Sequence, residues 1–301
     1  MMILAHLSDM HVSPLPRLHA SEFTLKRGLA YLSWQRKRKH RFSASVLRSM
    51  ITDIHAQSVD HVLVTGDQCN LSLKAEFTLA TAWLEQIGGP DFVSVIPGNH
   101  DAHLTRPQKT WDAHWRAYMQ GDDGNGEFPY LRRRGQVAII GVSSAIPTAL
   151  FMANGRVGTQ QLARLRTLLL RLKEEGLFRL VMIHHPPNIG AMQWRKALSD
   201  AEAFRAVLKE TGAELVLHGH GHEAVRATLE GPVGPIPVRG CASASGNGNR
   251  MPAAHYHVIG VEAAVQHWAL TISHRQYDSE TTLFAPMDEE TLTLPRHAPS
   301  V

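Results

Sequence analysis

Hydrophobic residues in the first hundred positions form short apolar runs that alternate with helical patterns. Three runs have the length and β-branched content of buried strands: residues 2–8 (MILAHLS), 61–65 (HVLVT) and 92–96 (FVSVI). Two segments between them carry apolar residues at helical spacing, namely residues 43–57 and 74–87. This strand–helix–strand–helix–strand order predicts parallel strands covered by helices.

The second half continues the alternation less regularly. Strands are predicted at residues 137–142, 179–183 and 214–218, with helices at 159–174 and 199–210. Shorter alternating runs predict antiparallel strands near 223–229, 236–242, 255–261 and 265–272. We expect one domain over residues 1–272. Residues 273–301 show no strong periodicity, and we expect them to form a C-terminal tail that wraps the surface or frays.

Residues 12–42 interrupt the alternation directly after the first strand. They mix basic residues with apolar ones, among them Phe23, Leu25, Leu29, Tyr31, Leu32 and Trp34. Because this segment leaves the carboxyl end of the first strand, where open α/β sheets bind ligands, it can form an active-site cap. A purely structural α-hairpin explains the same pattern equally well.

Composition limits the class of protein. The chain has 301 residues, of which 44% are hydrophobic and 19% charged, so it can bury one large core and is not a disordered chain. No apolar run approaches the roughly 18 residues needed to span a bilayer. The short apolar start lacks the preceding basic region of a secretion signal. Cys69 and Cys241 are far apart and form no disulfide pattern, so we expect a cytoplasmic protein.

Positive charge is concentrated in one place. The formal net charge is +4, and residues 36–41 read RKRKHR. Such a run is compatible with a solvated surface segment, or with contact to a phosphate-bearing partner or a membrane surface. One basic run does not make a nucleic-acid groove, so we expect no nucleic-acid module. Nothing in the sequence indicates an oligomeric state.

A polar cluster follows the end of several predicted strands. The clusters are Asp9-Met10-His11, Gly66-Asp67, Gly98-Asn99-His100-Asp101, His184-His185 and Gly219-His220-Gly221-His222. Two residues spaced i, i+2 after a strand can turn toward one ion, and glycine permits the tight bend. Carboxylate, imidazole and amide ligands suit borderline divalent metals. Each cluster alone is compatible with an ordinary turn, but the ordered set, placed on one edge of one sheet, predicts a metal site.

The ordered set resembles the calcineurin-like metallophosphoesterase superfamily, whose pattern is D-x-H, G-D, G-N-H-D, H-x-P and G-H-x-H. The resemblance covers about residues 2–225, and the segments HLSDMH and IHHPP are most similar to the class III cyclic nucleotide phosphodiesterase and glycerophosphodiesterase branch. It implies an α/β fold, a four-layer α-β-β-α sandwich of two mixed sheets, with 12–42 as an inserted helical and basic segment. It also implies two divalent metal ions, with Mn²⁺, Fe²⁺ and Zn²⁺ as candidates.

The resemblance further implies a role for each position. It assigns the two metal ions to two groups of ligands, Asp9, His11 and His222 for one and Asn99, His184 and His220 for the other. Asp67 would bridge both ions through its two oxygens. His100 would contact the phosphate and protonate the leaving group, and Asp101 would orient His100 by accepting from its ring nitrogen. His185 would lie behind the ligands or be structural.

Asn70 marks a departure from two branches of the superfamily. Purple acid phosphatases place a ligating Tyr three residues after the equivalent of Asp67, and Ser/Thr protein phosphatases have the pattern GDxxDRG. This chain has Gln68-Cys69-Asn70 instead, which argues against both types and leaves Asn70 beside the ligands rather than among them. For Cys69 we expect a buried, inert thiol, with an oxidant-sensitive one as the alternative.

These inferences lead to three hypotheses. The first is a dinuclear-metal phosphohydrolase acting on cyclic nucleotides or other small phosphodiesters. The second is a phosphomonoesterase or pyrophosphatase on a nucleotide-sugar or lipid-linked substrate, with residues 17–42 at the membrane surface. The third is a binding scaffold that has lost its chemistry. The presence of all seven implied ligands and of His100 argues against the third.

Overall fold

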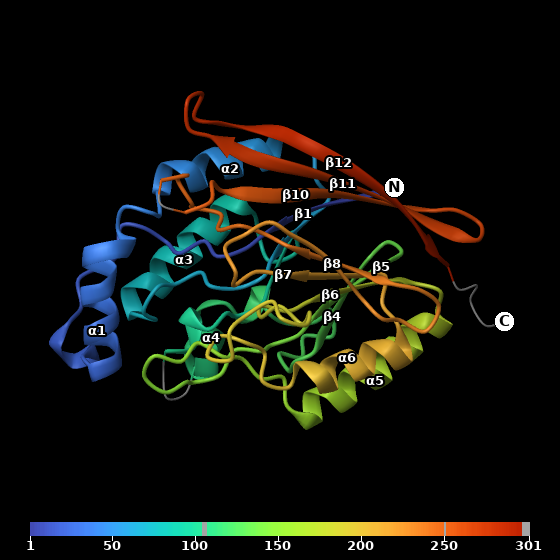
Figure 1. Ribbon diagram of the computed structural model, residues 1–301, viewed down its shortest axis with the longest axis horizontal. Helices are drawn as coiled ribbons and strands as arrows, with labels where there is room; N and C mark the ends of the chain where they lie inside the picture. The colour runs from blue at the N-terminus through green and yellow to red at the C-terminus, as the bar shows by residue number, and fades with distance from the viewer. Residues whose placement is uncertain (104–106, 250, 297–301) are drawn as a thin grey trace.

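The computed structural model of the protein describes residues 1–103, 107–249 and 251–296. Two six-stranded sheets pack against each other (Figure 1). The first sheet has the order β12-β11-β10-β1-β2-β3, with β1 at Met2–Leu7, β2 at His61–Val64, β3 at Val93–Val95, β10 at His255–Ala263, β11 at His267–Asp278 and β12 at Leu283–Pro295. The second has the order β4-β5-β6-β7-β9-β8, with β4 at Tyr130–Arg134, β5 at Val137–Gly141, β6 at Phe178–Met182, β7 at Leu215–His218, β8 at Val225–Leu229 and β9 at Ile236–Gly240.

Both sheets are mixed, as the family resemblance implies. In the first sheet β1, β2 and β3 run parallel, while β10 pairs with β1 in the antiparallel sense. In the second sheet β5, β6, β7 and β9 are parallel, and β4 and β8 are antiparallel to their neighbours. The antiparallel strand expected at 236–242 is confirmed in the pairing of β9 with β8, and on its other side β9 is also parallel to β7.

Helices complete the four layers. Alternate residues of the second sheet face opposite ways: Ile139 and Leu180 pack toward the first sheet, whereas Ile140 and Val181 pack on α5 (Thr159–Glu174) and α6 (Ala201–Thr211). Figure 1 shows α5 and α6 together along the outer side of this sheet. The apolar faces of α2 (Ala44–Ala56) and α3 (Lys74–Ile87) are buried in the core of the first sheet. The predicted sandwich is confirmed.

The predicted C-terminal tail is wrong. The expected boundary at residue 272 falls inside β11, and β12 continues the sheet over 13 residues to Pro295. This strand lies at the edge of the sheet and buries only Phe284 and Leu294, so its apolar pattern is too sparse to read from sequence. Residues 297–301 of the expected tail lie outside the described residues.

The inserted segment is helical and lies at one end of the molecule (Figure 1). It contains α1 (Leu25–Ser33), which begins at the N-cap Thr24 and continues into a π-helical turn at Trp34–Arg38. Arg27 anchors α1 by donating to the carbonyl oxygens of Leu71, at 3.1 Å, and Ser72, at 2.5 Å. A 3₁₀ turn at Ala20–Glu22 precedes α1, and further along the chain lie a short helix, α4 (Pro107–His114), and 3₁₀ turns at His100–Ala102 and Arg116–Tyr118. No helix in the described ranges is both long and apolar enough to cross a membrane.

Candidate active site

The polar clusters meet where parallel strands of both sheets end. Asp9, Asp67 and Asn99 follow β1, β2 and β3 of the first sheet, whereas His184 and His220 follow β6 and β7 of the second. The expectation of one edge of one sheet is therefore wrong. The clusters converge because the carboxyl ends of the parallel strands in both sheets lie on the same side of the sandwich.

The backbone at the site adopts an uncommon conformation. Five non-glycine site residues have positive φ angles, namely Asp9 (54°), His11 (40°), Asp67 (56°), His220 (68°) and His222 (55°). Side chains with a Cβ rarely occupy this region, and such residues concentrate at functional sites. Main-chain hydrogen bonds support two of these turns, from Asp9 N to Gly66 O at 2.9 Å and from His11 N to Asp67 O at 3.0 Å.

Two glycines allow these turns to approach one another. Gly66 has a φ of 102°, and a Cβ there would lie 2.6 Å from Nδ1 of His184. A Cβ at Gly98 would overlap the carboxylate of Asp67. Both positions therefore require glycine, because the second sheet and the loop after β3 pass directly over the Gly66-Asp67 turn.

Asp9, His11 and His222 form one group of potential metal ligands. Nε2 of His222 lies 3.1 Å from Oδ1 of Asp9 and 3.0 Å from Nε2 of His11. Nδ1 of His11 lies 3.0 Å from the carbonyl oxygen of Cys69, which can only accept, so Nδ1 carries the proton and Nε2 presents a lone pair. This group has the members that the resemblance implies.

Asp67, His184, Asn99 and His220 form the second group. Nε2 of His184 lies 3.4 Å from Oδ2 of Asp67 and 3.3 Å from Oδ1 of Asn99. Its Nδ1 is held at 2.7 Å by the carbonyl oxygen of Thr65, which again leaves Nε2 for a metal. The Nε2 of His220 contacts Lys196 O at 2.9 Å, so Nδ1 is its available nitrogen.

Asp67 lies between the two groups. Its Oδ2 is 3.9 Å from Nε2 of His11 and 3.4 Å from Nε2 of His184, while Oδ1 accepts from His100 N at 2.7 Å. The hydrogen bond to Oδ1 leaves that oxygen a second lone pair, so the bridging of both ions through the two oxygens of Asp67 stays a prediction. Oδ2 is the oxygen for which contacts to a histidine of each group are seen.

The electrostatics of the site favour cations. Burial alone would raise the pKa of Asp9, but the nearby imidazoles, first that of His222, hold it well below its usual range. Burial lowers the pKa of His184, yet the Asp67 carboxylate outweighs this effect and raises it to about 9. A metal ion at His184 Nε2 thus competes with a proton. Two carboxylates, an amide oxygen and buried imidazoles fit two borderline divalent ions.

His100 lies beside these groups with its own partners. Its Nδ1 is 2.6 Å from the carbonyl oxygen of Asn70 and therefore carries a proton, while Nε2 lies 3.3 Å from Nη1 of Arg38. The expectation that Asp101 orients His100 is wrong. The Asp101 carboxylate accepts instead from the main-chain N–H groups of Gly98, at 2.9 Å, and Cys69, at 2.8 Å, because these buried N–H groups need acceptors.

The comparisons with known proteins agree with this geometry. The family described as calcineurin-like phosphoesterase matches residues 2–224. The chain belongs to this family. Among curated proteins none matches the chain.

Solved structures of other phosphoesterases have the same fold. A dimetal phosphatase from Danio rerio is 12% identical, with a TM-score of 0.63 over 97% of this chain and 99% of its own. The purple acid phosphatase PPD1 from yellow lupin (Lupinus luteus) is 11% identical, with a TM-score of 0.62, and this chain covers about half of it (53%). At these identities the likeness concerns the fold.

Membership of the calcineurin-like phosphoesterase family makes the chain a metal-dependent phosphoester hydrolase with a dinuclear centre. Sequence reasoning missed one residue of this site, Arg38. Arg38 is the last residue of the π-helical turn in the insertion. Its guanidinium lies over the ring of Phe42, 5.2 Å from the ring centroid, and contacts His100. The basic run at 36–41 was the available signal, but it does not show which of its cations turns inward.

The two residues expected beside the ligands have distinct contacts. Asn70 supports His100 through its carbonyl oxygen and donates from Nδ2 to Val12 O at 3.0 Å. His185 is held by Ser144 Oγ at 2.7 Å on one ring nitrogen and by Ala153 O at 3.2 Å on the other. Both nitrogens are thereby occupied, so His185 packs behind His220 and is not placed to bind a metal.

Two adjoining cavities open beside the metal-ligand groups. The first, of about 440 Å³, is lined by ligands and by cations, among them Asp67, Asn99, His220, His222, Arg38 and Arg41. The second, of about 530 Å³, lies between α1 and the loop at 150–153, and its lining combines apolar side chains such as Leu29, Leu150 and Met152 with polar and basic ones such as Lys26 and Arg195. They share five lining residues, Arg38, Asn99, His100, Ala153 and Lys196.

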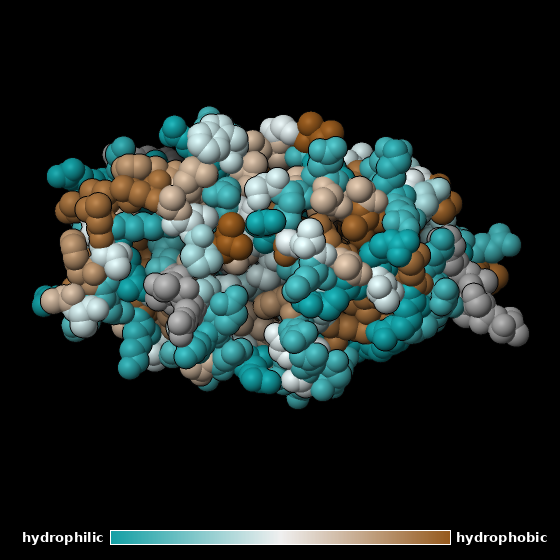
Figure 2. Space-filling model, turned by 90° about the horizontal axis from the view of Figure 1, so that it is seen from below, coloured by the Kyte–Doolittle hydropathy of each residue, from teal (hydrophilic) through white to brown (hydrophobic). Residues whose placement is uncertain are grey.

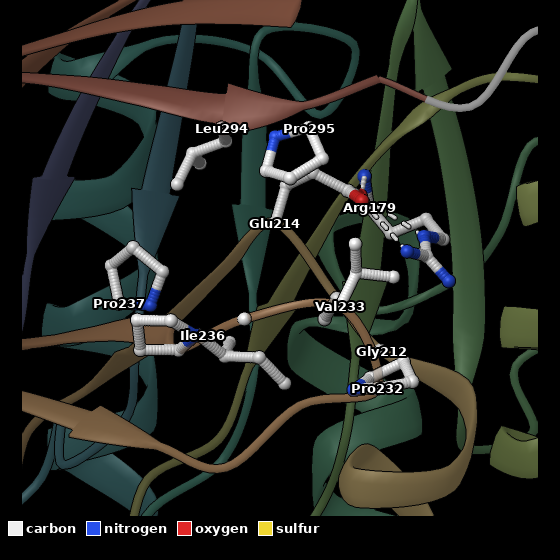
Figure 3. A pocket seen from close by; sticks show the side chains of 12 residues that line it. Arg179, Gly212, Glu214, Pro232, Val233, Ile236, Pro237, Leu294 and Pro295 are labelled. Carbon is white, nitrogen blue, oxygen red and sulfur yellow. Dashed lines mark hydrogen bonds and ion pairs between the residues drawn. The ribbon is translucent and has the colours of Figure 1, made fainter.

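A cavity elsewhere in the fold is not a substrate site. Figure 3 shows it beside the buried ion pair of Arg179 and Glu214, whose closest atoms are 2.7 Å apart. Its volume is about 40 Å³, and prolines such as Pro232 and Pro237 form part of its wall. It holds at most one or two water-sized molecules.

Proposed function

We propose that this phosphoesterase hydrolyses small phosphodiesters, with cyclic nucleotides among the candidate substrates. The observation that supports this proposal is the pair of cavities that meet at His100 and Arg38. A diester has an organic group on each side of phosphorus, and a phosphoryl group at the metal ligands would leave room for one group in each cavity.

The ligand set supports a metal-assisted hydrolysis at this site. When bound, two divalent ions such as Mn²⁺, Fe²⁺ or Zn²⁺ supply an activated water and neutralise phosphoryl charge. Asp9, His11 and His222 would hold one ion and Asn99, His184 and His220 the other, with Asp67 between them. The main-chain contacts of His11 and His184 hold their Nδ1 atoms and leave the Nε2 lone pairs free, so that each Nε2 would bind an ion.

His100 and Arg38 act on the phosphoryl and leaving groups. Because Nδ1 of His100 is fixed on Asn70 O, Nε2 is the atom that exchanges a proton with the leaving oxygen. Arg38 places a permanent positive charge at the same point, where negative charge develops as the ester bond breaks. In this mechanism no covalent phospho-enzyme forms.

A panel of substrates on the metal-reconstituted enzyme tests this function. It compares bis(4-nitrophenyl) phosphate, 4-nitrophenyl phosphate, 2′,3′- and 3′,5′-cyclic nucleotides, glycerophosphodiesters and a pyrophosphate-linked substrate, with Asp67→Asn as the inactive control. We expect kcat/KM to be higher for diesters than for the matched monoester. A clear preference for the monoester or the pyrophosphate would refute the diester proposal while leaving phosphoester hydrolysis intact.

A second candidate is a substrate held at a membrane surface, and the outer face of the insertion favours it. Phe23, Leu25 and Leu32 are 62%, 67% and 50% exposed. Exposed hydrophobic side chains gather at the end of the molecule where α1 lies (brown at the left of Figure 2). The basic run at 36–41 follows directly, and an apolar face flanked by cations suits an anionic bilayer.

Vesicle sedimentation tests this second candidate. We expect binding to vesicles that contain anionic phospholipid, and weaker binding after the double substitution Leu25→Ser and Leu32→Ser. The matched control is Val265→Ser, since Val265 is 92% exposed but lies between β10 and β11, far from the insertion in sequence. No vesicle affinity at low salt would refute the candidate. In either case we propose a cytoplasmic location, peripheral to the membrane in the second.

A further inference from the structure

A second group of metal-binding side chains lies in the core, outside the active site. His6 is on β1 and His257 is its direct partner on β10, while Cys241 follows β9 of the other sheet. All three residues are fully buried. The group therefore connects the two sheets, and the phosphoesterase chemistry uses none of its members.

The three side chains meet through their ligand atoms. Nδ1 of His6 lies 3.1 Å from Nδ1 of His257, and Sγ of Cys241 lies 3.3 Å from each of these nitrogens. Tetrahedral Zn²⁺, with bonds of roughly 2.0 Å to nitrogen and 2.3 Å to sulfur, holds such atoms roughly 3.3 to 3.6 Å apart. The catalytic ligands His11 and His222, whose Nε2 atoms are 3.0 Å apart, are spaced just as closely.

Hydrogen bonds also hold this group together, since Sγ of Cys241 lies 3.2 Å from the carbonyl oxygen of His6, to which the thiol donates, and one imidazole can donate from Nδ1 to the other. Two imidazoles that meet through Nδ1 atoms can place a proton on only one of them. Nε2 of His6 is 2.9 Å from Thr65 Oγ1, which can accept its proton and leave the Nδ1 lone pair directed at the group. Nε2 of His257 is buried and has no hydrogen-bond partner among the described residues, beside the neighbouring imidazoles of His255 and His274.

The protonation states agree with ligand chemistry. Burial, followed by neighbouring imidazoles, lowers the pKa of His6 and of His257 well below the usual value, so both rings are neutral, as ligands must be. Burial raises the pKa of the Cys241 thiol, so a thiolate forms there only when a cation compensates its charge.

We propose that His6, Cys241 and His257 form a third metal site, which binds a soft or borderline d¹⁰ cation, Zn²⁺ or Cu⁺. Two imidazoles and one thiolate are the ligands that such ions select. Because the site is buried and joins β1 and β10 to the end of β9, its role is to stabilise the contact between the sheets rather than to take part in hydrolysis.

Cobalt substitution tests the site directly, because Co²⁺ bound to a thiolate shows a near-ultraviolet charge-transfer band. None of the catalytic ligands contains sulfur, and the chain has two cysteines, Cys69 and Cys241. The variant Cys69→Ser, expressed with Co²⁺ in place of Zn²⁺, leaves Cys241 as the single thiol. We expect its band to be retained, and the band to be lost in Cys241→Ser.

Metal analysis completes the test. We expect the as-isolated wild type to contain one more Zn²⁺ or Cu⁺ per chain than Cys241→Ser, and the element found decides between the two cations. Absence of the band in cobalt-loaded Cys69→Ser would overturn the proposal, and this result does not depend on whether Cys241→Ser folds. Equal metal content in wild type and Cys241→Ser would overturn it as well.

Discussion

Arg38 provides a sharp test of how the insertion contributes to catalysis. The substitution Arg38→Met removes the guanidinium but keeps an unbranched stem that can cover the ring of Phe42. Arg38 forms no ion pair with a carboxylate in the described part of the chain, so its charge is available to an anionic substrate. The substitution therefore removes the proposed contact to substrate, together with the 3.3 Å contact of Nη1 with Nε2 of His100, without breaking an ion pair.

The size of the effect follows from the contact that is lost. A hydrogen bond to a charged group contributes about 1.5 to 3 kcal/mol. At about 1.4 kcal/mol for each factor of ten, kcat/KM should fall roughly 10- to 150-fold. Arg38→Lys should recover part of this loss, because lysine retains the charge but not the planar fork of donors.

The assay measures kcat/KM for a phosphodiester with the metal content of each variant determined in parallel. Arg36→Met is the matched control, since Arg36 belongs to the same basic run but is exposed and lines neither cavity. A loss of less than about threefold in Arg38→Met, which is below 1 kcal/mol, would refute the reasoning. An equal loss in Arg36→Met would show a general effect of net charge instead.

Three further changes have defined outcomes. His100→Ala should retain metal but lose roughly 10²- to 10⁴-fold in turnover on diesters with poor leaving groups, and an unchanged rate on these substrates would contradict its role. Gly98→Ala should displace the Asp67 carboxylate and lower the metal content, which mass spectrometry measures against Gly89→Ala, where a Cβ meets no neighbouring atom. Glu290→Gln should lower the unfolding free energy at neutral pH by about 1 kcal/mol, because Glu290 is half-buried against Arg239. Burial raises the pKa of Glu290, but Arg239 outweighs this effect and holds the pKa below 4.5. The ionised carboxylate therefore stabilises the wild type at neutral pH, and this stabilisation should be lost as the pH falls below about 4.5. Urea unfolding as a function of pH measures this decrease, which should be absent in Glu290→Gln.

The sequence by itself predicted where along the chain the candidate metal ligands lie, at the ends of strands. Asp9, Asp67 and His184 each follow an apolar run, and an apolar run of strand length indicates a buried strand wherever it lies in the fold. The helices at 44–56 and 159–174 could be predicted for the same reason, since helical spacing of apolar residues is a local property.

Only the tertiary structure decided which residues meet across the chain. The strand β12 has too few apolar residues to be predicted, and it is held by pairing with β11 and by contacts such as Arg239 with Glu290. The Asp101 carboxylate accepts from main-chain N–H groups rather than from His100, and Arg38, alone among the cations of the basic run, all of which the structure describes, contacts His100. His6 and Cys241 are 235 residues apart and still touch. Contacts of this kind depend on how two sheets pack, which no local pattern of residues specifies.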